Sequence, residues 1–141
     1  MPAIQRIANG TWHGDLKSGT GSIDATSGVL KDTPFSFATR FENAKGTNPE
    51  ELIAAAHAAC YSMAFSNYLS QQGHVPDTIA TKATISLEDG KINKMHLETR
   101  GRVAGLDNAT FKRLADEAEK KCPVSNLLRN GLTITLDAAL L

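Results

Sequence analysis

The feature that most constrains the fold is a long run of helix-forming, mostly apolar residues from about residue 49 to residue 72. Asn48 suits the N-cap of a helix, Pro49 suits its first position, and Glu51 completes a pattern like a capping box. Gly73 is placed to end the helix. Roughly 24 residues predict a helix of about 36 Å, and its many alanines predict a central, buried position. One stripe of this helix is formed by Leu52, Ile53, Ala56, Cys60 and Met63.

Short strand patterns broken by glycine fill the N-terminal part of the chain. The predicted pieces are residues 5–8, 11–14 and 21–25, with glycines between them as turns. From Phe35 to Phe41, phenylalanines alternate with smaller or polar residues, which is the period of a half-buried strand. The region before the long helix is therefore predicted to consist of strands.

Strand and helix patterns follow one another after the long helix. The predicted elements are strands over residues 78–87 and 91–103, a surface helix after Asp107 or Asn108, a short helix after Cys122, and a strand over residues 132–136. Asp89 and Gly90 form a hairpin signal between the first two strands. This order predicts a single α+β domain over residues 1–141, with largely antiparallel sheets.

Composition excludes several classes of partner. The 141 residues carry 15 basic and 15 acidic side chains with no run of like charge, so nucleic acid and anionic lipid are not expected partners. The amino terminus has no signal-like segment, and no stretch has the apolar length of a membrane span. A cytoplasmic location is therefore expected. Thiols are ordinarily kept reduced there, and a cysteine pair is more often catalytic, redox-sensing or metal-binding than structural.

The chain has two cysteines, Cys60 and Cys122, in different settings. Cys60 lies in the middle of the long helix, where the helix dipole has no effect, so a Cys60 thiolate needs a cation from elsewhere. Arg40 and His57 are the best candidates for that cation. Cys122 precedes Pro123 at a predicted helix start, where free backbone N–H groups favour a thiolate. The settings suggest a redox couple, although two inert buried cysteines would fit the same pattern.

Two further interpretations of the cysteines stay open at this point. His57 and Cys60 are three residues apart and could share a metal ion with Cys122, but the usual close pairs of zinc ligands are missing. The other histidines, His13, His74 and His96, are scattered. Cys60 could also act with His57 as the nucleophile of a hydrolase, although no third, orienting partner can be identified.

Several segments of the chain resemble the osmotically inducible protein C (OsmC) branch of the OsmC/Ohr peroxidase family, and the similarity runs over essentially the whole length. The matching segments are residues 11–19, 39–42, 45–53, 58–60 and the second cysteine motif Cys122-Pro123-Val124-Ser125. The arginine loop of the Ohr branch is absent. In the OsmC pattern, Arg40 takes the role of that arginine.

The resemblance implies a thiol-dependent peroxidase that reduces organic hydroperoxides to alcohols and protects against oxidative or osmotic stress. It implies an intertwined α+β homodimer with active sites at the interface, no cofactor, no metal, and a dithiol reductant of the lipoyl type. Carried onto this chain, Cys60 is the peroxidatic thiol and Cys122 the resolving thiol, joined by a disulfide after turnover. Arg40 and Glu50 position the hydroperoxide and the Cys60 thiolate.

Spacing along the long helix bears on the implied dimer. Glu50 and Cys60 are ten residues apart. On one continuous helix they lie about 15 Å apart along the axis and on different faces. If both serve one site, either the helix is broken or Glu50 comes from a second subunit. Four apolar side chains could line a slot for an alkyl tail or pack in the core: Phe37, Phe41, Met63 and Phe65.

Overall fold

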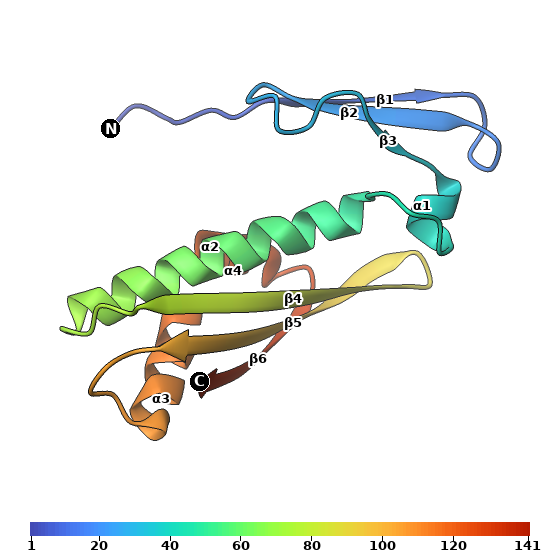
Figure 1. The fold of residues 1–141 in the computed structure, drawn as a ribbon. Coiled ribbons are helices and arrows are strands. Elements are labelled where there is room, and N and C mark those ends of the chain that lie inside the picture. The colour runs from blue at the N-terminus through green and yellow to red at the C-terminus, as the bar shows by residue number, and fades with distance from the viewer. The chain divides into compact units, whose positions relative to one another are not determined.

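A computed structural model describes all 141 residues, which fall into two compact units, residues 1–51 and 52–141. Figure 1 shows the elements in chain order, and their helices and strands confirm the predicted α+β class. The first unit contains β1, β2, β3 and α1. The second contains β4, β5, β6, α3, α4 and most of α2.

The first unit is built on a three-stranded antiparallel sheet in the order β1-β2-β3. Its strands are β1 (Ala8–His13), β2 (Thr20–Ala25) and β3 (Thr33–Phe35). The separate pieces predicted over residues 5–8 and 11–14 are wrong, because Gly10 pairs with Ile23 inside β1 instead of forming a turn. The turn after β1 begins at Gly14, which has a φ of 87°. The Trp12 indole N–H donates to the Gly14 carbonyl oxygen at 3.1 Å and so fastens this turn.

The strand predicted from Phe35 to Phe41 is also wrong, since α1 (Phe37–Phe41) is a short helix. Ser36 and Thr39 explain the difference. The Ser36 hydroxyl accepts from the Thr39 N–H at 3.2 Å, and the Thr39 hydroxyl accepts from the Ser36 N–H at 2.9 Å. This reciprocal cap satisfies two helix-end donors, and it outweighs the period-two pattern of the phenylalanines.

The long helix is α2 (Pro49–Gln71), within a residue of its predicted bounds. Asn48 is the predicted cap, because its side-chain oxygen accepts from the Glu51 N–H at 2.8 Å. The Glu51 carboxylate does not close the capping box and instead accepts from the Thr47 hydroxyl at 2.8 Å. Gly73, with a φ of 87°, follows the end of the helix as expected.

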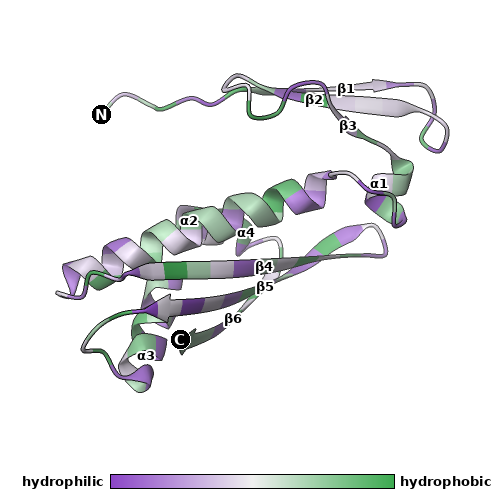
Figure 2. Cartoon of the chain, in the orientation of Figure 1, coloured by the Kyte–Doolittle hydropathy of each residue, from purple (hydrophilic) through white to green (hydrophobic).

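The buried stripe of α2 differs from the stripe of Leu52, Ile53, Ala56, Cys60 and Met63. It consists of His57, Tyr61, Phe65 and Leu69, four residues apart, and all four are fully buried. Met63 is 74% exposed. Large side chains decide which face of the helix packs, because burying them removes far more apolar surface than burying alanines. Hydrophobic and near-neutral residues extend along much of α2, so hydropathy alone does not mark this face (Figure 2).

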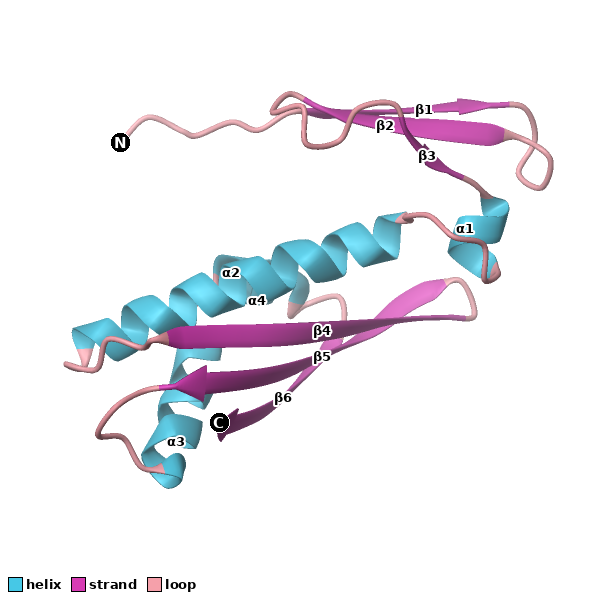
Figure 3. Ribbon diagram, viewed as in Figure 1, coloured by secondary structure: helices cyan, strands magenta, loops and turns pink.

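The second unit contains a sheet in the order β4-β5-β6. Its strands are β4 (Thr78–Glu88), β5 (Lys91–Arg102) and β6 (Thr133–Leu140). β4 and β5 form the predicted antiparallel hairpin, with positive φ at both Asp89 and Gly90. Three of the four strand pairings are antiparallel, which confirms the expectation of largely antiparallel sheets, whereas β6 is parallel to β5. The chain crosses back through α3 (Asn108–Glu119) and α4 (Pro123–Leu128) before β6 begins (Figure 3), and a crossover of this kind permits parallel pairing.

The core of the second unit joins α2, α3 and the sheet. Phe65 of α2 packs against Phe111 of α3 with ring centroids 4.9 Å apart, and both side chains are fully buried. The Tyr61 hydroxyl donates to the Ala115 carbonyl oxygen at 2.9 Å, which satisfies a buried polar group. Met95 and Leu97 of β5 complete the contact cluster. This core fixes the α2 segment that carries Cys60.

Candidate active site

The fold brings the two cysteines together. The Cys122 thiol lies 3.5 Å from Cys60 Sγ and is oriented to donate to it, and both side chains are free thiols. Cys122 is fully buried, whereas Cys60 is half-buried. A disulfide has an S–S length of about 2.05 Å, so joining the sulfurs needs a further approach of roughly 1.5 Å. One accessible thiol and one protected thiol therefore stand within easy reach of each other.

Cys122 is the N-cap of α4, as its place before Pro123 predicts. The Ser125 backbone N–H donates to Cys122 Sγ at 3.4 Å, and Pro123 occupies the first turn, where no N–H is required. These local features fix the direction of the Cys122 side chain. Cys60 is held from the other side, in the middle of α2.

A second contact between α2 and α4 lies one helical turn from the thiols. His57 Nε2 and Ser125 Oγ are 2.6 Å apart, and both side chains are fully buried. The sequence indicated His57 as a possible cation, metal ligand or hydrolase partner of Cys60, and it indicated no role for Ser125. The available signal was spacing, because His57 precedes Cys60 by three residues and Ser125 follows Cys122 by three.

The surroundings of Cys60 disfavour its thiolate. Burial is the largest effect and raises the pKa of the Cys60 thiol; the Val124 backbone N–H lowers it, the neighbouring Cys122 raises it again, and the net direction is upward. His57 is a poor source of compensating charge, because burial lowers the pKa of its imidazole. A reactive Cys60 thiolate therefore needs a cation from outside this cluster.

Cys60 lines an open cavity of about 560 Å³ in the second unit. The other lining residues are Met63, Ala64, Asn67, Tyr68, Gln71, Lys121 and Pro123. Phe65, considered above as a lining residue, belongs to the core instead. Lys121 Nζ lies 5.1 Å from the centroid of the Tyr68 ring, so a cation stands over an aromatic ring at the cavity wall.

Arg40 and Glu50 form the second cluster, in the first unit. Arg40 Nη2 and Nε donate to Glu50 Oε1 at 2.7 and 3.0 Å, and Nε also reaches Oε2 at 3.2 Å. Glu50 is buried and Arg40 is partly exposed. The four predicted site residues thus form two pairs, Cys60 with Cys122 and Arg40 with Glu50.

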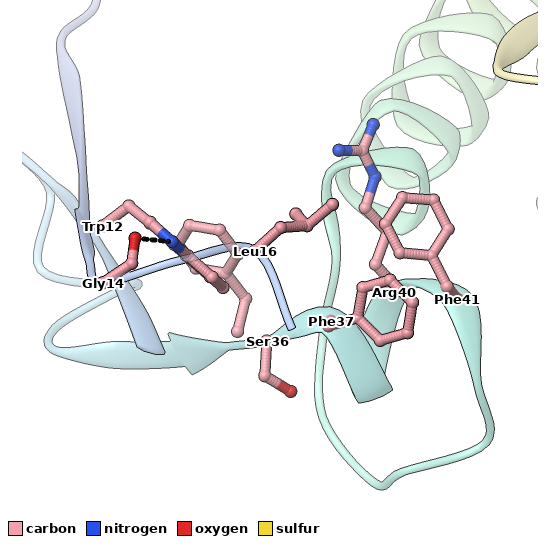
Figure 4. A pocket seen from close by; sticks show the side chains of 8 residues that line it. Trp12, Gly14, Leu16, Ser36, Phe37, Arg40 and Phe41 are labelled. Atoms are coloured by element: carbon pink, nitrogen blue, oxygen red, sulfur yellow. Dashed lines mark hydrogen bonds between the residues drawn. The ribbon is translucent and has the colours of Figure 1, made fainter. Parts of the chain in front are cut away.

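An apolar pocket of about 440 Å³ adjoins Arg40. Its lining residues are Trp12, Gly14, Leu16, Phe35, Ser36, Phe37, Arg40 and Phe41. Figure 4 shows Leu16 between Trp12 on one side and Phe37 and Phe41 on the other, with the Arg40 side chain beside the Phe41 ring. The Arg40 guanidinium carbon lies 5.1 Å from the centroid of that ring. The pocket therefore combines apolar walls with one positive group.

Two other observations concern sites of different kinds. No three His, Cys, Asp or Glu side chains are grouped so that they could hold a metal ion. None of the helices combines the length and the hydropathy that crossing a membrane would require.

Comparison with known proteins identifies the family. A family model described as OsmC-like protein matches residues 42–137. The chain is 44% identical to Peroxiredoxin OsmC of Escherichia coli (strain K12) over an alignment of 135 residues. This alignment covers 93% of this chain and 94% of that protein. Identity to the Organic hydroperoxide resistance protein of Xanthomonas axonopodis pv. citri (strain 306) is 34% over 98 residues, 67% of this chain and 68% of that protein.

A solved structure shows the same fold. The organic hydroperoxide resistance protein OhrB of Bacillus subtilis aligns with a TM-score of 0.70 at 27% identity, over 94% of this chain and 97% of that chain. The higher identity to Peroxiredoxin OsmC than to the Xanthomonas protein agrees with the predicted branch. The chain belongs to the OsmC-like protein family.

Proposed function

We propose that this protein is a thiol peroxidase that reduces organic hydroperoxides, with Cys60 as peroxidatic and Cys122 as resolving cysteine. The observation that carries the proposal is the 3.5 Å separation of a half-buried thiol and a fully buried thiol. Two relatives are named for the same chemistry, Peroxiredoxin OsmC and Organic hydroperoxide resistance protein. A Cys-His hydrolase is less well supported, because His57 Nε2 is engaged by Ser125.

The reaction follows from the two thiols. The Cys60 thiolate attacks the terminal oxygen of the hydroperoxide, so that an S–O bond forms, the O–O bond breaks, and the alkoxide leaves as an alcohol after taking a proton. The Cys122 thiolate then attacks the sulfur of the Cys60 sulfenic acid. The S–S bond forms, the S–O bond breaks, and hydroxide leaves as water after protonation. A small dithiol, of the lipoyl type, restores both thiols by two exchange steps and is itself oxidised to a disulfide.

Arg40 and Glu50 act at this site, in our proposal, from the partner subunit of a homodimer. The helix α2 is unbroken from Pro49 to Gln71, so a broken helix does not bring Glu50 to Cys60 of the same chain. The raised pKa of the Cys60 thiol calls for a cation, and Arg40 is a cation already oriented by Glu50. Residues 1–141 then act as one functional domain within an intertwined dimer.

Exposure in the first unit supports such a dimer. Glu50 is the one buried residue among residues 1–51. Large apolar side chains of this unit outside the pocket beside Arg40 are exposed, namely Met1, Ile4, Ile7 and Val29. A small sheet with so little buried surface is stabilised when a second chain covers it.

The pocket beside Arg40 supports an organic substrate. Trp12, Leu16, Phe37 and Phe41 offer an apolar surface to the alkyl or aryl group of a hydroperoxide, while Arg40 faces its polar end. Hydrogen peroxide has no group to fill such a pocket. Protection against organic hydroperoxides during stress, in the cytoplasm, is the corresponding cellular role.

Consumption of cumene hydroperoxide with dihydrolipoate as reductant tests the proposal. Wild type should turn over repeatedly, and Cys60→Ser should be inactive. A hydrolase would instead cleave an activated ester at equal rates in wild type and Cys122→Ser and consume no hydroperoxide. That pattern would overturn the peroxidase assignment.

A further inference from the structure

Two adjacent side-chain contacts, each called a rung below, join α2 to α4. One rung joins Cys60 to Cys122 at 3.5 Å, and the other joins His57 to Ser125 at 2.6 Å. Residues three apart on a helix lie on the same face. The His57–Ser125 rung therefore holds α4 against α2 in the alignment that places Cys122 next to Cys60.

The second rung is firmly anchored. His57 and Ser125 are both fully buried, so breaking their hydrogen bond leaves two polar groups without water. Ser125 is also bonded to the thiol itself, since its backbone N–H donates to Cys122 Sγ at 3.4 Å. One residue thus links the imidazole of α2 to the sulfur that must attack Cys60.

The far end of α4 is held by charges. Arg129, the C-cap of α4, donates to Glu119 Oε2 at 2.9 Å, and Lys120 Nζ lies 3.0 Å from the same oxygen. Burial raises the pKa of the Glu119 carboxyl, but the bonds from Arg129 and Lys120 outweigh burial and leave it below its ordinary value. Both ends of α4 are therefore fixed, the first turn by His57 and the last by Glu119.

The side of His57 away from Ser125 has an unusual feature. His57 Nδ1 and Glu119 Oε1 are both buried, and neither has a hydrogen-bond partner within the chain. A buried polar atom without a partner is costly. The imidazole occupies this place despite that cost, and its hydrogen bond to Ser125 is the favourable contact it makes there.

We propose that His57 and Ser125 are positioning residues for the resolving step. This inference rests on the proposed peroxidase function. The pair keeps Cys122 within reach of Cys60, so that the disulfide forms before a second hydroperoxide attacks the sulfenic acid. In that competing reaction a second S–O bond forms, the O–O bond breaks, alcohol leaves, and Cys60 becomes an irreversibly oxidised sulfinic acid.

The test compares sulfenate formation, disulfide closure and overoxidation by rapid quench and intact mass, with excess cumene hydroperoxide and no reductant. Ser125→Ala and His57→Leu should close the disulfide about tenfold more slowly, the effect of losing one ordinary buried hydrogen bond. The sulfinic product, heavier by about 32 Da, should accumulate in both variants while the rate of sulfenate formation stays near wild type. His57→Gln, which can still bond to Ser125, should restore closure.

A matched control is Ser62→Ala, which removes another α2 hydroxyl, bonded to Thr81 Oγ1 at 2.8 Å and away from α4. Ser62→Ala should form the Cys60–Cys122 disulfide at the wild-type rate. Closure at wild-type speed in both Ser125→Ala and His57→Leu would overturn the inference, as would equal slowing of sulfenate formation and closure.

A second arm separates this inference from the peroxidase proposal. Diamide oxidises the thiol pair without hydroperoxide: one thiolate adds to its N=N bond, and the second thiolate displaces the adduct to form the disulfide, so the rate of this second step reports how well the thiols are aligned. Slower closure in Ser125→Ala and His57→Leu supports the positioning of Cys122 by this pair, and a failure of wild type to react with cumene hydroperoxide would then overturn the peroxidase function alone. Unchanged closure contradicts the inference even if wild type is an active peroxidase.

Discussion

The sulfur atoms of Cys60 and Cys122 lie 3.5 Å apart although the two residues are 62 positions apart in the chain. The first thiol is on a long helix and the second caps a short one, and packing between the two helices brings them together. Because the sulfurs are already close, a disulfide can form with little movement of either helix. In the proposed peroxidase cycle, this proximity serves the step in which the disulfide forms.

Removing the Arg40 charge should raise the pKa of Cys60. A cation near a thiol favours the thiolate, and burial already raises the pKa of the Cys60 thiol. Arg40→Met should therefore move the pH profile of Cys60 alkylation by iodoacetamide toward higher pH. If the pKa of Cys60 rises by about one, the alkylation rate at pH 7 falls about tenfold. Reaction would be measured in Cys122→Ser, so that Cys60 is the one thiol present.

Arg100→Met is the control for this measurement. Arg100 forms ion pairs with Glu98 and Asp137 at 3.0 and 3.1 Å on the sheet of the second unit, away from the cysteines. Arg100→Met removes one positive charge, as Arg40→Met does, and should leave the pH profile of Cys60 alkylation unchanged. An unchanged profile in Arg40→Met would mean that Arg40 does not face Cys60 in any subunit arrangement.

Leu16→Asn should weaken the binding of bulky hydroperoxides. Leu16 lines the pocket beside Arg40 and is 58% exposed, so replacing it should disturb the fold little. Loss of apolar contact predicts a KM for cumene hydroperoxide higher by about three- to tenfold, with a small change for hydrogen peroxide. An equal change for both substrates would show that the pocket does not receive the organic group.

Protonation of His57 should make the folded protein less stable as the pH falls. Burial lowers the pKa of His57 in the folded protein, so the unfolded chain binds a proton that the folded chain does not. The free energy of unfolding should decrease as pH falls below about 6.5, the ordinary pKa of histidine, toward the lower folded value. Glu119, Lys120 and Arg129 are the charged groups near this site, and the lowered pKa of Glu119 keeps it ionised in this range.

Urea unfolding of wild type and His57→Gln at pH 8, 6 and 5 measures this effect. The difference in unfolding free energy between the two proteins should change in favour of His57→Gln as pH falls. The other histidines are common to both proteins and cancel. A pH-independent difference would show that His57 takes up its proton equally well when folded.

Phe65→Ala should destabilise the fold while leaving both cysteines in the sequence. Phe65 is fully buried against Tyr61 and Phe111. Truncating a buried phenylalanine to alanine costs about 3–5 kcal/mol, so the urea midpoint should fall strongly. Met63→Ala, on the same helix but 74% exposed, should change unfolding by less than about 1 kcal/mol.

The sequence predicted those features that local chemistry decides. Asn48 caps α2, Cys122 caps α4, and Asp89 with Gly90 turns the hairpin, because each depends on neighbours within a few residues. The family resemblance supplied the pairing of Cys60 with Cys122, which no local pattern could show.

Features that depend on tertiary packing were not predictable from the sequence. Helix α1 is an exception, because the Ser36–Thr39 cap that outweighs the phenylalanine alternation is local and could have been recognised in the sequence. The buried face of α2 runs through Tyr61 and Phe65. The sequence did not single out this face, because the alanines make every face of the helix look apolar. The His57–Ser125 contact spans 68 positions, so no spacing within one segment could reveal it.

The most direct test of the central claim is the intact mass of the acid-quenched protein before and after one equivalent of cumene hydroperoxide. Wild type should lose roughly 2 Da as the Cys60–Cys122 disulfide forms, Cys122→Ser should gain about 16 Da as a sulfenic acid, and Cys60→Ser should not change. An unchanged mass for wild type would contradict the peroxidase assignment and leave Cys60 and Cys122 as packing residues.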